Sequence, residues 1–144
     1  MPWGRRILNN IERVMNMSEA IDSLNHVIEE LKSDLDKGLL GSGIWNAKDG
    51  QQIAHYQARA KAAALFNEVT RMLKKTLSGS EFPGLGSYYL VHLDNGNVVI
   101  VVRCGDYQLG ALVDLSETTM GILMSVALPN LQQNLKEATS KLPQ

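Results

Sequence analysis

The segment YYLVHLDNGNVVIVVRCG, which runs from Tyr88 to Gly105, constrains the fold more than any other part of this sequence. Asn95-Gly96 is a hairpin-turn signal between two runs of β-forming residues. The second run, Val98 to Val102, is apolar at five consecutive positions. Because successive side chains of a strand point to opposite faces, both faces of this strand must be buried. The segment therefore predicts an interior strand of a sheet that helices cover on both sides.

The rest of the sequence alternates between helical and strand-like patterns. An apolar stripe from Ile21 to Leu35 predicts a helix, with Ser18 as its cap and Gly38 at its end. Short turns within each group of strands require antiparallel pairing. The sequence thus predicts an α+β fold, a five-stranded antiparallel sheet sandwiched by helices. We expect the first and last helices on one face and the second helix on the other. The expected order is helix 19–36, strands 39–46 and 51–57, helix 58–78, strands 87–94, 98–104 and 105–115, and a last helix from about residue 116.

Residues 1–17 are expected to form a helical extension ahead of a domain over residues 18–144. Apolar residues recur every seven positions from Ile7 to Leu35, and a continuous helix over about 5–36 would be about 48 Å long. Such a helix exceeds the domain, so its first part must project or fold back. Two alternatives remain: only residues 19–36 cover the sheet, or the first turns also dock against a partner, a second subunit or a membrane surface. The contact face would then consist of Trp3, Ile7, Ile11 and Val14.

The second helix has two contrasting sides. One arc is broadly apolar and is expected to face the sheet: Ala62, Leu65, Phe66, Val69, Met72, Leu73 and Leu77. The opposite arc is small and uncharged over its first half, and it contains Ala60, Ala63, Ala64, Asn67 and Arg71. Alanine is the best helix former, which explains this arc by propensity alone. Alternatively, its small side chains let another backbone approach closely.

The sequence carries no recognisable catalytic or metal-binding motif. In a hairpin with a two-residue turn, His92 faces Val99, which places Cys104 about 16 Å further along and on the opposite face. This geometry excludes a thiolate–imidazole pair. Single, widely spaced histidines and one cysteine give no metal-ligand spacing. We therefore expect no catalytic residues, no cofactor and no metal, and hence not an enzyme.

Composition limits the partners and the cellular compartment. A net charge of −1 argues against nucleic-acid binding, which needs a concentrated basic surface. One cysteine allows no internal disulfide and suits a reducing cytoplasm. No apolar run approaches the ~18 residues of a membrane span, so no integral membrane segment is expected.

The order of these elements resembles the roadblock/dynein light chain family, within the roadblock–longin superfamily. Three segments carry the resemblance: GLLGSGIWNAKDGQQIAHY as the first hairpin, AKAAALFNEVTRML as the Ala-rich helix, and YYLVHLDNGNVVIVVRCGDYQLGALV as the three-strand meander. The resemblance covers about residues 19–140, and the extension before Ser18 is longer than a minimal member needs.

The resemblance implies a homodimer or heterodimer in which the second helix and the strand after it pair with their counterparts. It implies a non-catalytic protein that serves as a scaffold on motor or signalling complexes or regulates small Ras-like GTPases. An alternative is a small-ligand-binding sensory module with a pocket between sheet and helix. The interface residues expected from the resemblance and the alanine face are Ala60, Ala63, Ala64, Asn67, Arg71, Tyr88, Leu90 and His92.

Overall fold

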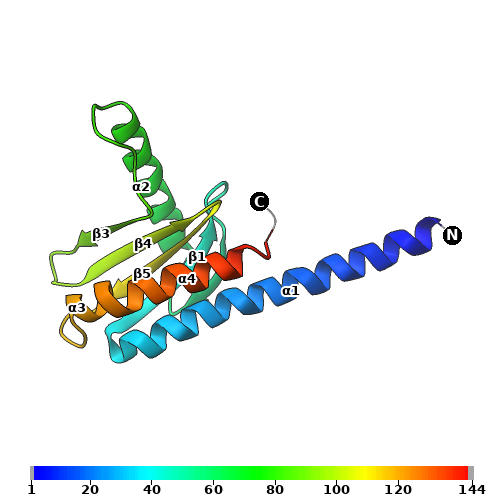
Figure 1. Cartoon of the computed structure of the whole chain (residues 1–144), viewed down its shortest axis with the longest axis horizontal. Helices are drawn as coiled ribbons and strands as arrows, with labels where there is room; N and C mark the ends of the chain where they lie inside the picture. Colours follow the sequence, from blue (N-terminus) through cyan, green and yellow to red (C-terminus); the bar gives the residue numbers. More distant parts are fainter. Residues whose placement is uncertain (1, 143–144) are drawn as a thin grey trace.

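The computed structural model describes the backbone of residues 2–142 and the side chains of residues 4–142. Helices and a sheet of five strands make up most of it (Figure 1). The elements are α1 (Pro2–Leu35), η1 (Asp36–Gly38), β1 (Leu39–Asn46), β2 (Gln52–Tyr56), α2 (Ala60–Ser78), β3 (Tyr88–His92), β4 (Val98–Cys104), β5 (Tyr107–Val113), α3 (Met120–Ile122), the π-helical turn η2 (Leu123–Ala127) and α4 (Leu128–Thr139).

The five strands form one antiparallel sheet in the order β2-β1-β5-β4-β3. Strand β4 lies between β5 and β3, and its residues Val98 to Val102 are at most 6% exposed. The prediction of an interior strand buried on both faces is therefore confirmed. Strand β3 forms one edge of the sheet.

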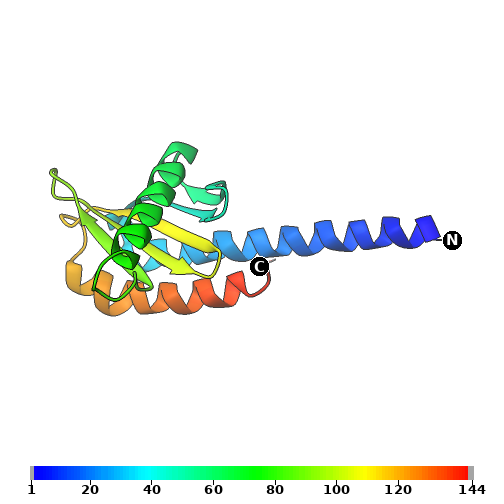
Figure 2. The ribbon, with the colours of Figure 1, turned by 90° about the horizontal axis from the view of Figure 1, so that it is seen from above.

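Helices cover the sheet unequally. The second half of α1 lies beside α4 on one face, and together they bury the larger core (Figures 1 and 2). Helix α2 crosses the other face alone. Its cluster contains only Trp45, Ala63, Val99 and Val101 as fully buried members. The predicted placement of the three helices is confirmed, but the α2 side has much less cover than the α1–α4 side.

The β3–β4 hairpin differs from the prediction by one residue. Val98 lies opposite His92, and Val99 lies opposite Val91. The Leu93 backbone N–H donates to the Asn97 carbonyl at 2.8 Å, so the loop has three residues, 94–96. Gly96 has a φ of 90°. A three-residue loop with a left-handed residue at its end adds a bulge, which the expected two-residue turn lacks.

Helix α1 continues through Ser18, which lies exposed within the helix and caps nothing. The predicted helix start at this residue is wrong, because the 34 residues from Pro2 to Leu35 form one helix. At about 1.5 Å per residue the helix is about 51 Å long, and its first half projects beyond the end of the sheet (Figures 1 and 2). Ala20 is the first buried residue of the described part of α1.

The last helical segment begins later than Ser116. The Asp114 carboxylate accepts hydrogen bonds from the backbone N–H and the hydroxyl of Ser116, and this turn delays the helix to Met120. Pro129 is the second residue of α4, two positions after the end of the π-helical turn η2, which accommodates the backbone change that a proline requires. Within the described residues no helix is long and apolar enough to span a bilayer.

Candidate interaction surface

Polar side chains attach α2 to the sheet. The Trp45 indole Nε1–H donates to Asn67 Oδ1 at 3.2 Å, and Asn67 Nδ2 donates to the Ala47 carbonyl at 3.2 Å. One turn further along, the hydroxyls of Thr70 and Tyr89 lie 2.7 Å apart. Burial raises the pKa of the Tyr89 phenol, although the bond to Thr70 and the nearby Arg103 act in the opposite direction. These contacts fix which side of α2 faces the sheet.

The side of α2 that faces the sheet only partly matches the predicted arc, in which Phe66 does pack against the buried cluster. Leu65 and Met72 were expected in the core, but they are 58% and 61% exposed. Ala63 and Asn67 were expected at an interface, but they are 2% and 6% exposed within the protomer. The hydrogen bonds of Asn67 outweigh the apolar preference of the other arc, since an unpaired buried indole N–H is costly. Both expectations are corrected here.

The remaining predicted interface residues of α2 stay accessible. Ala60 and Ala64 are exposed on the first two turns of the helix. Arg71 is also exposed, and its guanidinium bonds Glu68 at 2.8 Å on the same helix. A surface ion pair of this kind contributes little to stability.

Strand β3 offers unpaired backbone groups along the sheet edge. Leu93 and Ser87 bond to Asn97 and Arg103 of the neighbouring chain segment. In an antiparallel pair every second residue exchanges backbone hydrogen bonds with the neighbouring strand. The backbone groups of the alternate residues between Ser87 and Leu93 therefore point away from β4. Those residues are Tyr88, Leu90 and His92, the three that the resemblance places at an interface.

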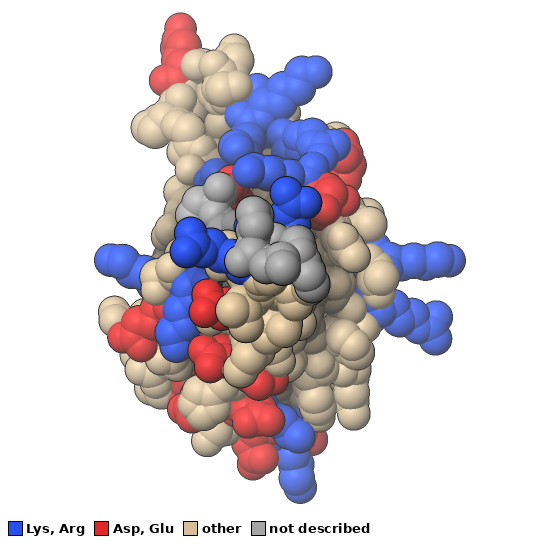
Figure 3. All heavy atoms as spheres, turned by 90° about the vertical axis from the view of Figure 1, so that its right-hand side faces the viewer, with Lys and Arg blue, Asp and Glu red and all other residues tan. Residues whose placement is uncertain are grey.

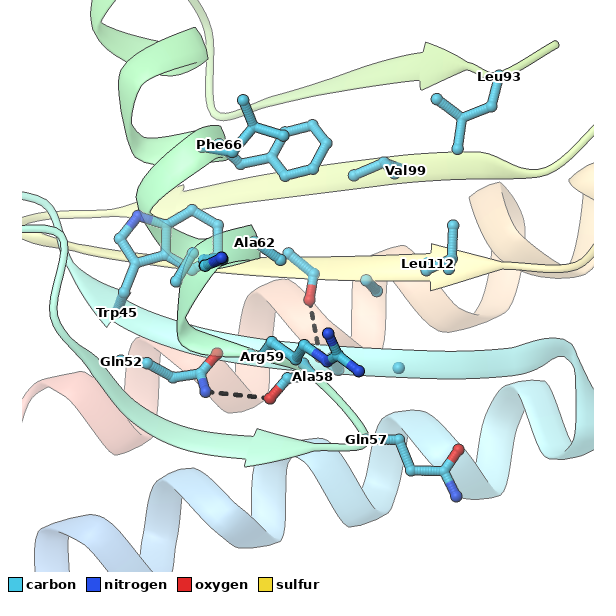
Figure 4. Close-up of a pocket in the computed structure, with 18 residues that line it drawn as sticks. Trp45, Gln52, Gln57, Ala58, Arg59, Ala62, Phe66, Leu93, Val99 and Leu112 are labelled. Carbon is cyan, nitrogen blue, oxygen red and sulfur yellow. Dashed lines mark hydrogen bonds between the residues drawn. The ribbon is translucent and has the colours of Figure 1, made fainter.

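Beside α2 the sheet is hollowed by an apolar groove of about 690 Å³ (Figure 4). Its floor includes Val99 and Leu112, and Phe66 and Leu65 of α2 form one wall. Gly110 contributes to the floor, and its missing side chain leaves room for the Trp45 ring, which lies 3.0 Å from where a Cβ would stand. The groove thus exposes Leu65 and Phe66 of the apolar arc together with the part of the sheet that α2 leaves uncovered.

One polar group in the groove lacks a partner. Gln52 Nε2 donates to the Ala58 carbonyl at 3.3 Å (Figure 4), while its buried Oε1 has no protein hydrogen bond. Arg59 and Lys61 also line the groove and give it a basic border. Figure 3 shows that Lys and Arg side chains gather in the upper half of that view, the half in which α2 lies.

His92 and Cys104 do not meet. With Val98 opposite His92, Cys104 lies six residues further along β4, or about 20 Å, and the even spacing places both side chains on one face. The predicted opposite faces are therefore wrong, while the separation still prevents a catalytic pair. The Cys104 thiol instead lies 3.2 Å from the Thr139 hydroxyl of α4. In the part of the chain that the structure describes, no three His, Cys, Asp or Glu side chains form a group that could hold a metal.

The projecting half of α1 presents apolar side chains to the outside. Ile7 and Ile11 are each 50% exposed, and Val14 is 69% exposed. The side chain of Trp3, the fourth residue expected in this contact face, lies outside the described residues. Whether this face contacts a partner remains a prediction.

Solved structures with the same architecture identify the fold. No protein-family model matches the chain, and no curated protein matches it. MglB of Myxococcus xanthus is 12% identical, with a TM-score of 0.72 over 86% of this chain and 92% of that one. An MglB structure with a tetrameric arrangement is 13% identical, with a TM-score of 0.65 over 81% and 89%. A Roadblock/LC7 domain from Streptomyces avermitilis is 13% identical, with a TM-score of 0.60 over 81% and 97%. The sheet order, the helices on both faces and the likeness to these structures together show that the chain has the roadblock/LC7 fold.

Proposed function

We propose that this chain is a non-catalytic, dimeric adaptor or regulator that acts in the cytoplasm, and that its partner is a small Ras-like GTPase or a motor or signalling complex. The observation that carries the proposal is the apolar groove beside α2, which reaches Leu93, the residue that follows the edge strand β3. In the family that the sequence resembles, proteins of this architecture act by binding other proteins.

Dimerisation would cover both features of this surface. The apolar arc of α2, with Leu65 and Met72 exposed, lies on the same side of the sheet as the groove. Phe82, in the loop that leads from α2 to β3, is 74% exposed. Contiguous apolar surface, such as the groove that Leu65 lines, marks protein contacts more often than free surface. A two-fold axis beside β3 would pair the edge strands and bring the two α2 helices together. That one of the matched MglB structures has a tetrameric arrangement is consistent with self-association.

Proline substitutions on β3 test the paired edge. In Tyr88→Pro/His92→Pro both prolines remove N–H groups that point outward, so the hydrogen bonds to β4 remain. We expect a folded monomer by light scattering and circular dichroism, where the unmodified chain is a dimer. Val91→Pro is the matched control, because it removes a bond to β4 and should destabilise the fold itself. A dimer that survives the double substitution, or an unmodified chain that is monomeric at micromolar concentration, refutes the edge pairing.

Nucleotide turnover tests the partner. The purified chain is added to a small GTPase encoded beside its gene, and binding and GTP hydrolysis are measured. We expect complex formation and an altered hydrolysis rate. A Leu65→Asp/Met72→Asp variant should weaken binding if the partner uses the α2 surface, while Glu81→Lys in the exposed loop serves as control. If the GTPase neither binds the chain nor changes its rate of GTP hydrolysis, the regulator function is refuted and only the scaffold function is left.

The groove also favours a second candidate, a small-ligand-binding module. A concave apolar site with a few polar groups is the usual form of a ligand pocket. Here Gln52 Oε1 lacks a hydrogen bond and Arg59 lies at the border. This function predicts that an apolar acid that also carries a hydrogen-bond donor, for Arg59 and Gln52 Oε1, raises the melting temperature without changing the oligomeric state. The same ligands should have no effect if the groove serves only as a protein contact.

A further inference from the structure

The projecting half of α1 is amphipathic, yet its apolar side is turned away from the domain. Between residues 4 and 19 no side chain is buried. Five apolar residues of this segment form an exposed stripe, which we call the α1 stripe: Ile7 (50% exposed), Leu8 (62%), Ile11 (50%), Val14 (69%) and Met15 (60%). A helix that only extended the core would bury such residues or lack them.

The α1 stripe does not continue the core-facing side of the same helix. At about 100° per residue, the centre of the stripe lies roughly 150° around the helix from the buried residues of the second half. The recurrence of apolar residues every seven positions therefore does not place one apolar face along the whole of α1. The buried residues that define the core-facing side are Ala20, Leu24, Val27, Ile28, Leu31 and Leu35.

The polar side of the projecting half faces the rest of the chain. Asn9, Glu12 and Arg13 lie across a shallow cleft from Lys141 and Leu142 at the end of the described chain. The C-terminal segment thus approaches α1 from its polar side. Among the described residues nothing covers the α1 stripe. Its cover would therefore have to come from a molecule outside the described part of the chain.

Charge indicates which partner fits. Residues 1–17 contain three arginines and one glutamate, a net charge of +2, whereas the rest of the chain has eleven basic and fourteen acidic residues, a net charge of −3. Two copies of this segment side by side would repel each other. An anionic surface would attract them, and the long arginine side chains can reach it from the polar side of the helix.

The width of the α1 stripe also argues against a coiled coil. In a two-stranded seam, only two positions per heptad are apolar and charged residues flank them. Here Leu8 and Met15 widen the stripe, and Gly4 and Ser18 lie near its centre, where a seam needs bulky residues. A wide apolar face with arginines behind it is typical of helices that lie in a membrane interface.

We propose that residues 4–17 lie on the surface of an anionic phospholipid bilayer, with the α1 stripe inserted among the lipids. The segment extends away from α2 and β3 (Figures 1 and 2), so membrane contact leaves the proposed protein surface free. Figure 3 looks along this projection from its free end. The helix lies on the bilayer and does not cross it, in agreement with its many polar residues.

Vesicle binding of the full chain tests the proposal. Sedimentation with phosphatidylcholine vesicles, and with vesicles that contain about 30% phosphatidylglycerol, separates apolar from electrostatic attraction. We expect at least tenfold tighter binding to the anionic vesicles, weakened by added salt. Trp45 is 2% exposed and hydrogen-bonded, so a blue shift of tryptophan emission on binding reports Trp3.

Two variants separate the contributions of the stripe and of the arginines. Ile11→Gln/Val14→Gln keeps the charge and the helix but removes two apolar side chains of the α1 stripe, and should weaken binding at least tenfold. Arg5→Gln/Arg6→Gln should abolish the preference for anionic lipid. Lys37→Gln/Lys136→Gln removes two positive charges elsewhere and should change binding less than threefold. All six residues are exposed, so thermal unfolding should stay unchanged.

Three results would overturn the proposal. The first is the absence of binding to anionic vesicles. The second is an equal loss of binding in the lysine control, which would mean that the net charge of the whole protein is responsible. The third is a lower oligomeric state of Ile11→Gln/Val14→Gln without lipid, which would identify a second copy as the occupant. The prolines on β3 test the proposed dimer separately.

Discussion

Replacing Asn67 by alanine should destabilise the protein strongly although the residue is polar and lies on a helix that covers only part of a sheet. Asn67 is 6% exposed, and it joins the Trp45 indole to the Ala47 carbonyl through two bonds of 3.2 Å. Each bond contributes about 0.5–1 kcal/mol, and leaving the buried indole N–H unpaired costs about 1–2 kcal/mol more. We expect a loss of about 2–4 kcal/mol in the free energy of unfolding.

Urea unfolding at fixed protein concentration measures this loss. With a slope of about 2 kcal/mol per molar urea, the midpoint should fall by about 1–2 M. Asn25→Ala is the control, because Asn25 is exposed on α1 and its removal should change stability by less than about 0.5 kcal/mol. Trp45→Phe in the Asn67→Ala background removes the unpaired donor, so the double variant should lose less than the sum of the single losses. Strictly additive losses, or an Asn67→Ala midpoint equal to that of the unmodified chain, would refute the polar-anchor explanation.

Three further predictions follow from the same region. Ala63→Arg should unfold the protein and the adjacent Ala64→Arg should leave it folded, as circular dichroism will show, because Ala63 is 2% exposed and Ala64 lies on the surface. Gly50→Ala should cost about 1 kcal/mol in urea unfolding, since Gly50 has a φ of 72° and packs on Asn67; an unchanged midpoint would contradict this. Burial raises the pKa of Tyr89 above 10.0, so the folded state favours the neutral phenol; its contribution to stability is complete below about pH 10 and is lost as the pH rises through the raised pKa. Urea midpoints at pH 9 and 11 should fall less in Tyr89→Phe than in the unmodified chain.

Much of the fold could be predicted from local patterns. The apolar run Val98 to Val102 required cover on both faces, and the structure provides it. The strand bounds Leu39–Asn46 also agree with the sequence. The hairpin register could not be predicted, because Asn-Gly suits both a two-residue turn and the three-residue loop that the structure contains. One bonded pair, Leu93 with Asn97, decides between them.

The candidate surface was only partly predictable. The outward-pointing residues of β3 follow from the strand alternation once the register is known. The orientation of α2 does not, because a hydrophobic arc predicts burial only if nothing else competes for the sheet. Here the side of α2 that carries Asn67 faces the sheet because Asn67 accepts a hydrogen bond from Trp45, a residue 22 positions away in the sequence. A single Asn between apolar helical positions gave no signal of this bond.

The sequence by itself determined the layered architecture, since alternation and apolar periodicity are local properties that each segment carries wherever it folds. Only the tertiary structure decided which sides of α1 and α2 remain outside. For α2 the deciding contact is the hydrogen bond from Trp45 to Asn67. For α1 the deciding feature is that burial begins at Ala20, whereas the helix already starts at Pro2. Both depend on where distant residues meet, and a local pattern carries no information about that.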